Sequence, residues 1–321
     1  MKFAFAAVVL GGAVVIGLVG YFGVRSIGDE VLAAGWVIPI TTALLFIQLF
    51  LSAAAWRITV GEARPRLGRY FRIRWVREAV NSLLPVAQLG GNLVGIRMLV
   101  QRGVAGPVAA AGTTLDLTIE AVTQFLFTVA GFVVLIGLDT RGSGGAAPWV
   151  GWSLGVMGFG LLGFVLAQRA GLLRLIEWLA ARLTRLFPGL SVESVLGLHR
   201  ELMRLHQDRT ALAKATGLHL LAWVLGVIET WLVLFAMGHV PSLSEAFVIE
   251  SLGMAARSAG FAVPGALGVQ EAGFIVVCDL FGLGADVAIA LSMVKRAREL
   301  LVGIPGLVVW QWAEGKRLLR R

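Results

Sequence analysis

Cysteine and charge are both scarce in this chain of 321 residues, which has one cysteine, Cys278, and 15% charged residues. A single cysteine excludes an internal disulfide and a metal cluster held by cysteines, and its apolar surroundings predict a buried, inert thiol. The four histidines show no metal-ligand spacing, and no phosphate-binding loop, Gly-x-Ser-x-Gly turn or metalloprotease histidine pair occurs. We therefore expect no metal, no cofactor, no catalytic residue, and no ATP-driven work by this chain alone.

Apolar residues, in contrast, make up 58% of the chain. A soluble domain is typically about 45–50% apolar and about 25% charged, so the composition departs from that class in both directions. It predicts a polytopic, all-α membrane protein, and the 41 glycines suit helices that pack closely in lipid. The net charge of +9 lies in the loops between apolar runs, where orientation in a membrane requires it. Nucleic acid is therefore not expected as a partner.

The apolar runs predict a single transmembrane domain over residues 1–321 with about 6–8 membrane helices. The first run, 3–24, is longer than the apolar core of a signal peptide and is expected to be a retained helix. The next span is 31–55. Two basic segments, near 57–77 and 168–214, are expected on the cytoplasmic side together with both termini. For 57–77, an interfacial amphipathic helix and a solvated orientation signal are both compatible with the pattern.

Two proline-centred segments with ionisable residues interrupt the apolar pattern. Residues 79–100 have arginine at both flanks, which predicts a re-entrant hairpin that starts and ends on the cytoplasmic face and breaks near Pro85. Residues 244–282 have a similar pattern around Pro264 and would either re-enter from outside or cross twice. Polar groups persist in hydrocarbon only where they face protein or water, and broken helices in corresponding halves indicate a transport site. We therefore expect two re-entrant helical hairpins in an inverted repeat.

Arg77 and Arg257 stand eight and seven residues before the two prolines. On the first arm of a hairpin, each would reach a central cavity, where a planar guanidinium suits an anionic headgroup. Glu78, Glu250 and Glu271 are the expected counter-charges. The alternative is that buried arginine–glutamate pairs only hold two helices together.

Further polar groups fall inside the predicted spans. Asp116 and Glu120 lie four residues apart and share one helix face, where they pair with arginine or line a proton-linked cavity. The charged stretch 295–299 interrupts an apolar run, either at a membrane interface or at the outer side of the cavity. The full set of candidate substrate-binding residues is Arg77, Glu78, Asn81, Pro85, Gln88, Asn92, Asp116, Glu120, Glu229, Arg257, Pro264, Gln270, Glu271 and Arg298.

Three stretches resemble the lysylphosphatidylglycerol synthase transmembrane-region family, which is flippase-like, and its hopanoid-biosynthesis branch most of all. They are Glu78-Ala-Val-Asn-Ser-Leu-Leu-Pro-Val-Ala-Gln-Leu-Gly-Gly, Arg257-Ser-Ala-Gly-Phe-Ala-Val-Pro-Gly-Ala-Leu-Gly-Val-Gln-Glu-Ala-Gly and Lys295-Arg-Ala-Arg-Glu-Leu-Leu. The resemblance covers essentially the whole chain and implies a bacterial inner-membrane fold with re-entrant helices and a lipid-handling cavity. In the founding members a soluble aminoacyl-transferase domain follows. The residues after Trp312 are too few for it, so the synthase activity is not expected.

The resemblance implies translocation or handling of a lipid, either a hopanoid or a lipid with an anionic headgroup, without enzymatic activity. Two alternatives stay open. One is a membrane-embedded enzyme that acts on a lipid headgroup with Asp116, Glu120 or Glu271 as acid or base. The other is a scaffold that recruits lipid-synthesis enzymes through 168–214. The expected partners are membrane lipids, with a second copy of the chain or lipid-synthesis enzymes as further options.

Overall fold

A computed structural model of the chain describes residues 24–61, 65–84, 90–138, 201–205, 207–260 and 263–318, with short helical pieces at 16–17 and 20–21. These residues form helices and connecting turns and contain no strand. In chain order the helices are α2 (Val24–Ala33), η1 (Gly35–Val37), α3 (Ile38–Val60), α4 (Leu67–Leu83), α5 (Gly90–Val100), α6 (Gly106–Gly137), α10 (Arg209–Ala236), α11 (Leu243–Ala259), η2 (Pro264–Ala266), α12 (Val269–Asp279) and α13 (Ala285–Leu318).

Three of the described helices are long and apolar enough to cross a membrane: Gly35–Val60, Gly106–Gly137 and Arg209–Ala236. The protein is therefore an all-α polytopic membrane protein, as the composition predicted. A fourth long helix, α13, has 34 residues and contains the charged stretch in its interior. The predicted helix at 3–24 lies almost wholly outside the described residues, as do the predicted return span after α6 and most of the basic segment 168–214.

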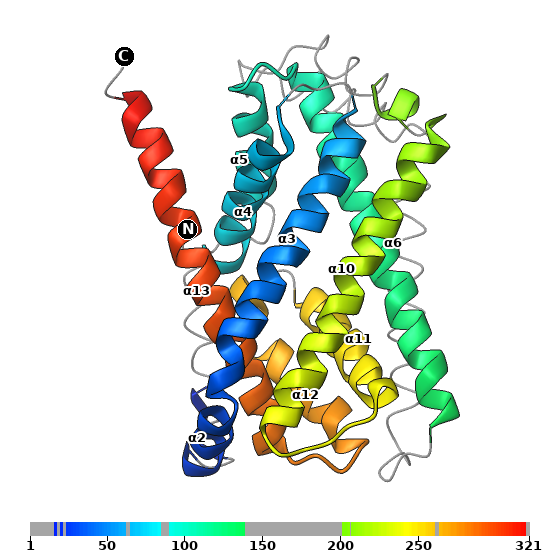
Figure 1. The fold of residues 1–321 in the computed structure, drawn as a ribbon, viewed down its shortest axis with the longest axis vertical. Helices are drawn as coiled ribbons and strands as arrows, with labels where there is room; N and C mark the ends of the chain where they lie inside the picture. The colour runs from blue at the N-terminus through cyan, green and yellow to red at the C-terminus, as the bar shows by residue number, and fades with distance from the viewer. Residues whose placement is uncertain are drawn as a thin grey trace.

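The two ends of the helix bundle differ in charge. We call them the basic end, where α3 and α13 end and α6 and α10 begin, and the acidic end, where α6 and α10 end and α13 begins (Figure 1). The basic end carries Arg57, Arg66, Arg69, Arg72, Arg102 and Arg209, together with Glu201 and Asp208. The acidic end carries Asp29, Glu30, Glu245, Asp279 and Asp286, together with Arg25.

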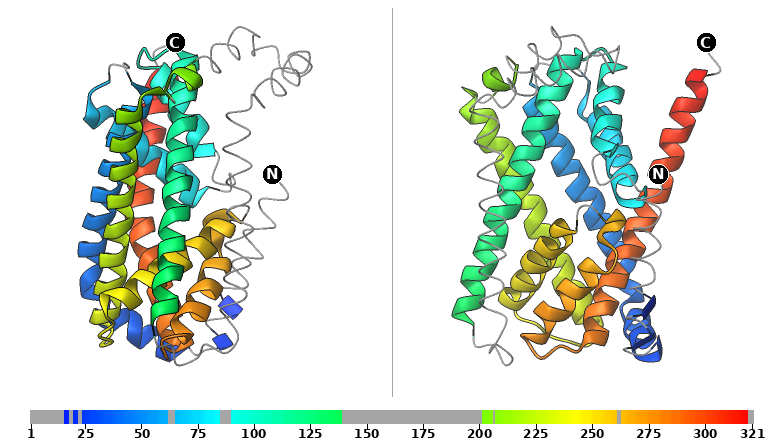
Figure 2. Two further views of the ribbon diagram at one scale, coloured as in Figure 1. Left: turned by 90° about the vertical axis from the view of Figure 1, so that its right-hand side faces the viewer. Right: turned by 180° about the vertical axis from the view of Figure 1, so that it is seen from behind.

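Two hairpins of short helices stand between the long helices. In each, an arm of 17 residues packs on an arm of 11 residues: α4 with α5, and α11 with α12. At 1.5 Å per residue the arms are about 25 and 17 Å long, shorter than the roughly 30 Å of a hydrocarbon core. The first hairpin extends inward from the basic end and the second from the acidic end (Figures 1 and 2), and α4 contacts η2 of the second hairpin midway.

The described helices form two halves of the same design. Each half is a long helix, a 17-residue arm, an 11-residue arm and a second long helix: α3, α4, α5, α6 and α10, α11, α12, α13. The chain runs through the two halves in opposite directions (Figure 2). The packing follows the same relation: α4 packs on α13, the last long helix of the second half, and α11 packs correspondingly on α6, the last long helix of the first half. The first long helices of the two halves, α3 and α10, pack along each other. This is the topology of an inverted repeat.

Glycine lets the two arms of each hairpin approach closely. A methyl group on Gly91 of α5 would lie 2.2 Å from the backbone oxygen of Arg77 on α4, and the Gly91 N–H donates to Asn81 Oδ1 at 2.8 Å. In the second hairpin, a methyl group on Gly273 of α12 would lie 2.3 Å from Cβ of Ala256 on α11. Neither hairpin tolerates a larger side chain at these positions.

Glycine also fixes each hairpin to the long helix of the other half. A methyl group on Gly306 of α13 would lie 2.7 Å from Cβ of Ala79 on α4, and one on Gly131 of α6 would lie 1.8 Å from the hydroxyl of Ser251 on α11. In both halves the first arm of the hairpin is thus in close contact with a glycine of the long helix of the other half.

The first hairpin begins earlier than the sequence predicted. The expectation was a basic segment over 57–77 followed by a hairpin over 79–100, whereas α4 begins at Leu67. Arg74 and Arg77 consequently lie inside the first arm and are 4% and 2% exposed. This part of the segment is thus one arm of a hairpin rather than a solvated loop.

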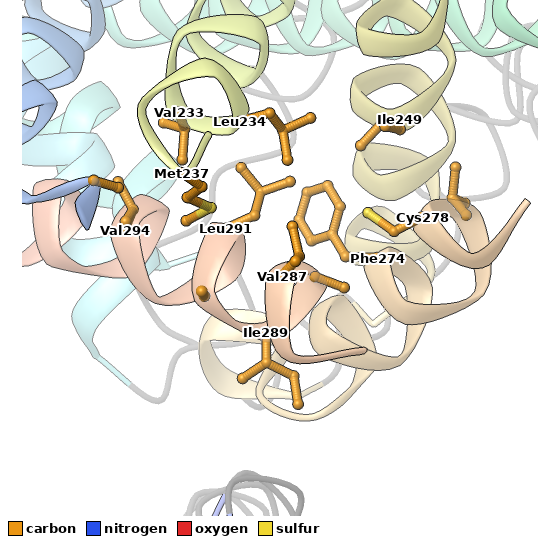
Figure 3. Packing of buried hydrophobic residues seen from close by; sticks show 14 of the residues in the cluster. Val233, Leu234, Met237, Ile249, Phe274, Cys278, Val287, Ile289, Leu291 and Val294 are labelled. Carbon is orange, nitrogen blue, oxygen red and sulfur yellow. The ribbon is translucent and has the colours of Figure 1, made fainter. Parts of the chain in front are cut away.

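Apolar side chains fill the acidic end between α10, α11, α12 and α13. Figure 3 shows Leu234, Met237, Phe274 and Leu291 within this buried cluster. Cys278 belongs to the same cluster and is a buried free thiol, which confirms the expectation of a packed cysteine. The polar residues of the hairpins lie beyond this cluster, toward the middle of the bundle.

Candidate functional site

A cavity of about 580 Å³ lies where the hairpins meet the middle of α3, α6, α10 and α13. Part of its wall is apolar, with Leu45, Leu117 and Phe125 among the lining residues. The charged part of the wall is formed by four arginines, Arg74, Arg77, Arg257 and Arg298, and four glutamates, Glu78, Glu120, Glu250 and Glu299. Such a concentration of charge inside a membrane protein indicates a functional site.

The first ion-pair cluster joins α4 to α6. Arg74 and Arg77 lie three residues apart on α4 and face Asp116 and Glu120, four residues apart on α6. Arg74 lies 2.7 Å from Glu120 and 3.3 Å from Asp116. Arg77 lies 3.0 Å from Asp116 and 3.4 Å from Glu120. Each guanidinium therefore contacts both carboxylates, so the two positive charges are neutralised within the protein.

Two side chains from neighbouring helices complete this cluster. The Arg77 guanidinium lies over the ring of Trp56 on α3, 5.4 Å from its centroid, a distance suited to a cation–π contact. His219 on α10 lies with Nε2 3.1 Å from Asp116 Oδ1 and also lines the cavity. Four helices thus converge on one carboxylate and its partners.

The second cluster joins α11 to α13 through Arg257. Its guanidinium donates to Glu299 Oε1 on α13 at 2.6 Å and to the side-chain oxygen of Gln270 on α12. Gln270 in turn donates to Ser292 at 2.7 Å. Arg257 therefore connects both arms of its hairpin to the long helix that follows.

The third cluster lies deepest, between α10, α11 and α13. Lys295 is 1% exposed, and its Nζ lies 2.8 Å from Glu250 and 3.5 Å from Glu229. Arg298 lies 2.8 Å from the other oxygen of Glu229, and the hydroxyl of Thr230 donates to Glu250 at 2.6 Å. Two carboxylates and two cations are thus buried together, and Glu250 and Arg298 extend from this cluster to the cavity wall.

Glu271 fixes the turn of the second hairpin. One of its oxygens accepts from Arg296 Nε at 2.6 Å and from Ser292 at 2.8 Å, and the other accepts from the Gly268 N–H at 2.8 Å. Arg296 also donates to the backbone oxygen of Gly265 at 3.1 Å. Gly265 and Gly268 have φ of 61° and 82°, values that favour glycine.

The inverted repeat places oppositely charged pairs at equivalent positions. Arg74 is the eighth residue of α4, and Glu250 is the eighth residue of α11. Their partners, Asp116 and Lys295, are each the eleventh residue of the long helix that ends the half. The Arg74–Asp116 pair of the first half therefore corresponds to Glu250–Lys295 in the second, with the signs exchanged between hairpin and long helix.

The structure places the candidate residues in three groups. Those that line the cavity are Arg77, Glu78, Asn81, Asn92, Glu120, Arg257 and Arg298. A second group is buried behind the wall, where each member contacts an arginine: Asp116, Glu229, Gln270 and Glu271. Pro264 begins the turn of the second hairpin, and Pro85 and Gln88 lie outside the described residues.

The counter-charges differ from those expected. Arg77 pairs with Asp116 and Glu120 rather than with Glu78, and Arg257 pairs with Glu299 rather than with Glu250 or Glu271. The correct partners are 39 to 43 residues away in the sequence. A neighbouring glutamate on the same helix points elsewhere, whereas a residue on the facing helix meets the guanidinium directly.

Sequence reasoning missed Arg74 and His219 as cavity residues. Arg74 was assigned to a basic loop, although its position three residues before Arg77 places both on one helix face. His219 lies in an apolar run of α10, where an ionisable side chain is itself the signal of a partner. Within the described residues, no group of three or more histidines, cysteines or carboxylates is arranged to hold a metal ion.

These features define a class of protein: a polytopic helical membrane protein with a charged cavity between two hairpins of opposite direction. The chain belongs to the lysylphosphatidylglycerol synthase TM region family, whose sequence model matches residues 8–306. It is therefore a lipid-related membrane protein. Comparison with curated proteins and with solved structures gives no match.

Proposed function

We propose that this protein is flippase-like and moves a lipid with an anionic headgroup between the two leaflets of the bilayer. The observation that carries the proposal is the charged cavity at the place where two oppositely directed hairpins meet. In transporters built from inverted repeats, the substrate site lies near the bilayer midplane at the interface of broken helices. The hairpins, too short to cross, would re-enter the membrane from its two sides.

The arginines support an anionic headgroup as the substrate. Arg77 comes from the first hairpin and Arg257 from the second, so a headgroup between them would contact both halves. Arginine binds phosphate through a planar fork of donors. Each guanidinium already has a carboxylate partner, and a buried pair contributes little net stability. A phosphate that replaces a carboxylate as the partner would keep the guanidinium paired and release the contact between hairpin and long helix.

The same charges disfavour a hopanoid as the lipid that fills the cavity. A hopanoid presents a largely hydrocarbon ring system, and its burial gains nothing from a wall with four arginines and four glutamates. We therefore retain the anionic-headgroup lipid of the two lipid classes that the sequence suggested.

The charge difference between the two ends supports an orientation. Positively charged loops face the cytoplasm, so we place the basic end there, in a bacterial inner membrane. The end of α13 lies at the basic end (Figure 2), which agrees with a cytoplasmic C-terminus, and the N-terminus is assigned to the same side.

We also propose that the protein acts without covalent chemistry. The carboxylates suggested as acids or bases, Asp116, Glu120 and Glu271, each accept hydrogen bonds from arginine. The oxygens that would exchange a proton with a substrate are thus occupied by guanidinium groups. This arrangement supports binding and movement of a lipid over acid–base catalysis.

Translocation in proteoliposomes tests the proposal. Phosphatidylglycerol labelled on an acyl chain keeps its headgroup, and dithionite bleaches only the label in the outer leaflet. We expect wild-type protein to expose the inner pool within the assay. Loss of a charge-assisted contact worth about 1.5–3 kcal/mol should slow Arg257→Ala or Arg77→Ala by tenfold or more. Arg72→Ala is the matched control, because Arg72 is exposed on the same helix as Arg77.

Each variant is compared for monodispersity and thermal stability before the assay. Arg257→Ala combined with Glu299→Ala removes both members of the pair and leaves no buried charge unpaired, which separates loss of binding from misfolding. Equal rates for wild type, Arg77→Ala and Arg257→Ala would contradict the proposal, as would bleaching no faster than in protein-free vesicles.

A further inference from the structure

His219 connects the cavity to the first ion-pair cluster. Its side chain is 2% exposed, it lines the cavity, and its Nε2 lies 3.1 Å from Asp116 Oδ1. The other oxygen of this carboxylate, Oδ2, accepts from Arg74 at 3.3 Å and from Arg77 at 3.0 Å. One carboxylate therefore joins the imidazole ring to both arginines of α4.

The four charges of the first ion-pair cluster balance when the ring of His219 is neutral, and Glu78 of α4 lines the same cavity outside this cluster. Arg74 and Arg77 from α4 contribute two positive charges, and Asp116 and Glu120 from α6 contribute two negative charges. The cavity-lining residues of α3 are uncharged. A proton on His219 would therefore give this cluster one positive charge in excess.

The other charged groups near α10 have partners of their own further along the helix. Glu250 of α11 meets α10 at Gly226 and pairs with Lys295. Arg298 pairs with Glu229. These contacts lie about two turns or more from His219, so the local balance rests on α4 and α6.

We propose that His219 binds a proton together with the anionic headgroup of the lipid, an inference that rests on the proposed function. Histidine is the side chain whose charge ordinarily changes between pH 5 and 8. When His219 is protonated it supplies Asp116 with a positive partner, so that one of the two arginines, the other still paired with Glu120, is available to a phosphodiester. Linkage requires the reverse effect as well: a bound headgroup strengthens proton binding by the same factor. Proton and anion then enter the cavity as a neutral pair, which lowers the cost of burying the charge.

Calorimetry of a short lipid tests the proposal on the purified full-length protein. Dihexanoyl phosphatidylglycerol carries a phosphodiester that stays ionised between pH 6 and 8. Titration at pH 7 in two buffers of different protonation enthalpy counts the protons taken up per lipid bound. We expect uptake of a fraction of one proton, and binding about tenfold tighter at pH 6 than at pH 8, within the usual range of coupling between two ligands. Glycerophosphoglycerol, the same headgroup without acyl chains, shows whether the phosphodiester alone links the proton.

Two variants assign the proton to the residue. His219→Gln keeps a donor for Asp116 but no titrating charge, so both the uptake and the pH dependence should be lost. His239→Gln is the matched control, because His239 lies in the loop after α10 outside the cavity, and its uptake should equal that of wild type. His219→Lys supplies a permanent charge and should bind tightly at both pH values, which gives a second test if the glutamine variant does not fold.

The outcomes separate this inference from the proposed function. Uptake with either probe that His219→Gln abolishes supports the inference. Lipid binding without proton uptake, or uptake that survives in His219→Gln, overturns it and leaves the proposed function standing. If neither probe binds to wild-type protein, the proposed function fails and this inference fails with it.

Discussion

Removing the charge of Lys295 should destabilise the protein more than any change to an exposed lysine. Lys295 is 1% exposed and lies between Glu250, 3% exposed, and Glu229. In Lys295→Met, Glu229 keeps Arg298 at 2.8 Å. Glu250 keeps only the hydroxyl of Thr230 at 2.6 Å among the described residues. The variant therefore buries one carboxylate without a compensating charge.

The size of the effect follows from that unpaired charge. Removal of one partner from a buried ion pair costs about 3–5 kcal/mol. For chains of 150–250 residues, 1 kcal/mol corresponds to about 2–4 °C in Tm, so we expect a decrease on the order of 10 °C. A second substitution, Glu250→Gln, removes the unpaired charge while its amide oxygen can still accept from Thr230. The double variant should regain most of the lost stability, to within about 1–2 kcal/mol of wild type.

Thermal unfolding in detergent, at one scan rate for all variants, measures this difference. Lys214→Met is the control, because Lys214 is exposed on α10. The change in its Tm should correspond to no more than about 0.5 kcal/mol in stability. A Tm for Lys295→Met within about 2 °C of wild type would refute the reasoning. So would a double variant no more stable than Lys295→Met, since the cost would then not arise from Glu250.

Three shorter predictions concern the hairpins and the cavity. Gly91→Ala should lower stability in the same unfolding assay by about 1–3 kcal/mol or more. Gly68 has open space around it, so Gly68→Ala should be neutral or raise stability by up to about 1 kcal/mol. Equal Tm values for the two variants would contradict the close approach of the hairpin arms. Ala222→Phe should fill the cavity and stop lipid movement with little change in Tm, and normal transport would show that the lipid takes another route. Glu271→Gln should increase hydrogen exchange at residues 263–268, because Arg296 loses its charged partner there; unchanged exchange would mean that the turn does not depend on this pair.

The predicted segment 244–282 agrees with the bounds of the second hairpin, although a hairpin and two crossings were both open, and the first hairpin agrees only in part. Around Pro264, glycine and proline break an apolar run that has little charge at its start, so the segment 244–282 agrees closely with α11 and α12. In the first hairpin the opening arm is rich in arginine, which is typical of a cytoplasmic loop. Only the facing helix, with Asp116 and Glu120, makes burial of Arg74 and Arg77 affordable, and the distance of about 40 residues hides that partnership from a linear reading.

The candidate site shows the same limit. Residue type and position identified Arg77, Arg257, Asp116 and Glu120 as members of polar clusters, because ionisable groups in apolar runs need partners. The choice of partner depends on which helices face each other, and the inverted packing of α4 on α13 and of α11 on α6 is a property of the tertiary structure. His219 was missed for this reason, since its role depends on a carboxylate 103 residues earlier.

The glycine contacts described above group six of the helices into two bodies. They hold α4 to α5 and to α13, and they hold α11 to α12 and to α6, so each body combines a hairpin with the long helix of the other half. The ion pairs run across this division, from α4 to α6 and from α11 to α13. Close packing therefore holds each body together, and around the cavity ion pairs join one body to the other, in addition to the apolar cluster at the acidic end.

These two kinds of contact respond differently to the surroundings. A helix that packs closely against a glycine has no second arrangement of equally low energy. A guanidinium, in contrast, can exchange one oxygen partner for another or for water. Salt, pH or a charged solute in the cavity consequently acts on how the two bodies sit against each other and leaves the interior of each unchanged. The positions of glycine in this chain thus define two rigid bodies. The positions of its charged residues define contacts between these bodies that can rearrange around the cavity.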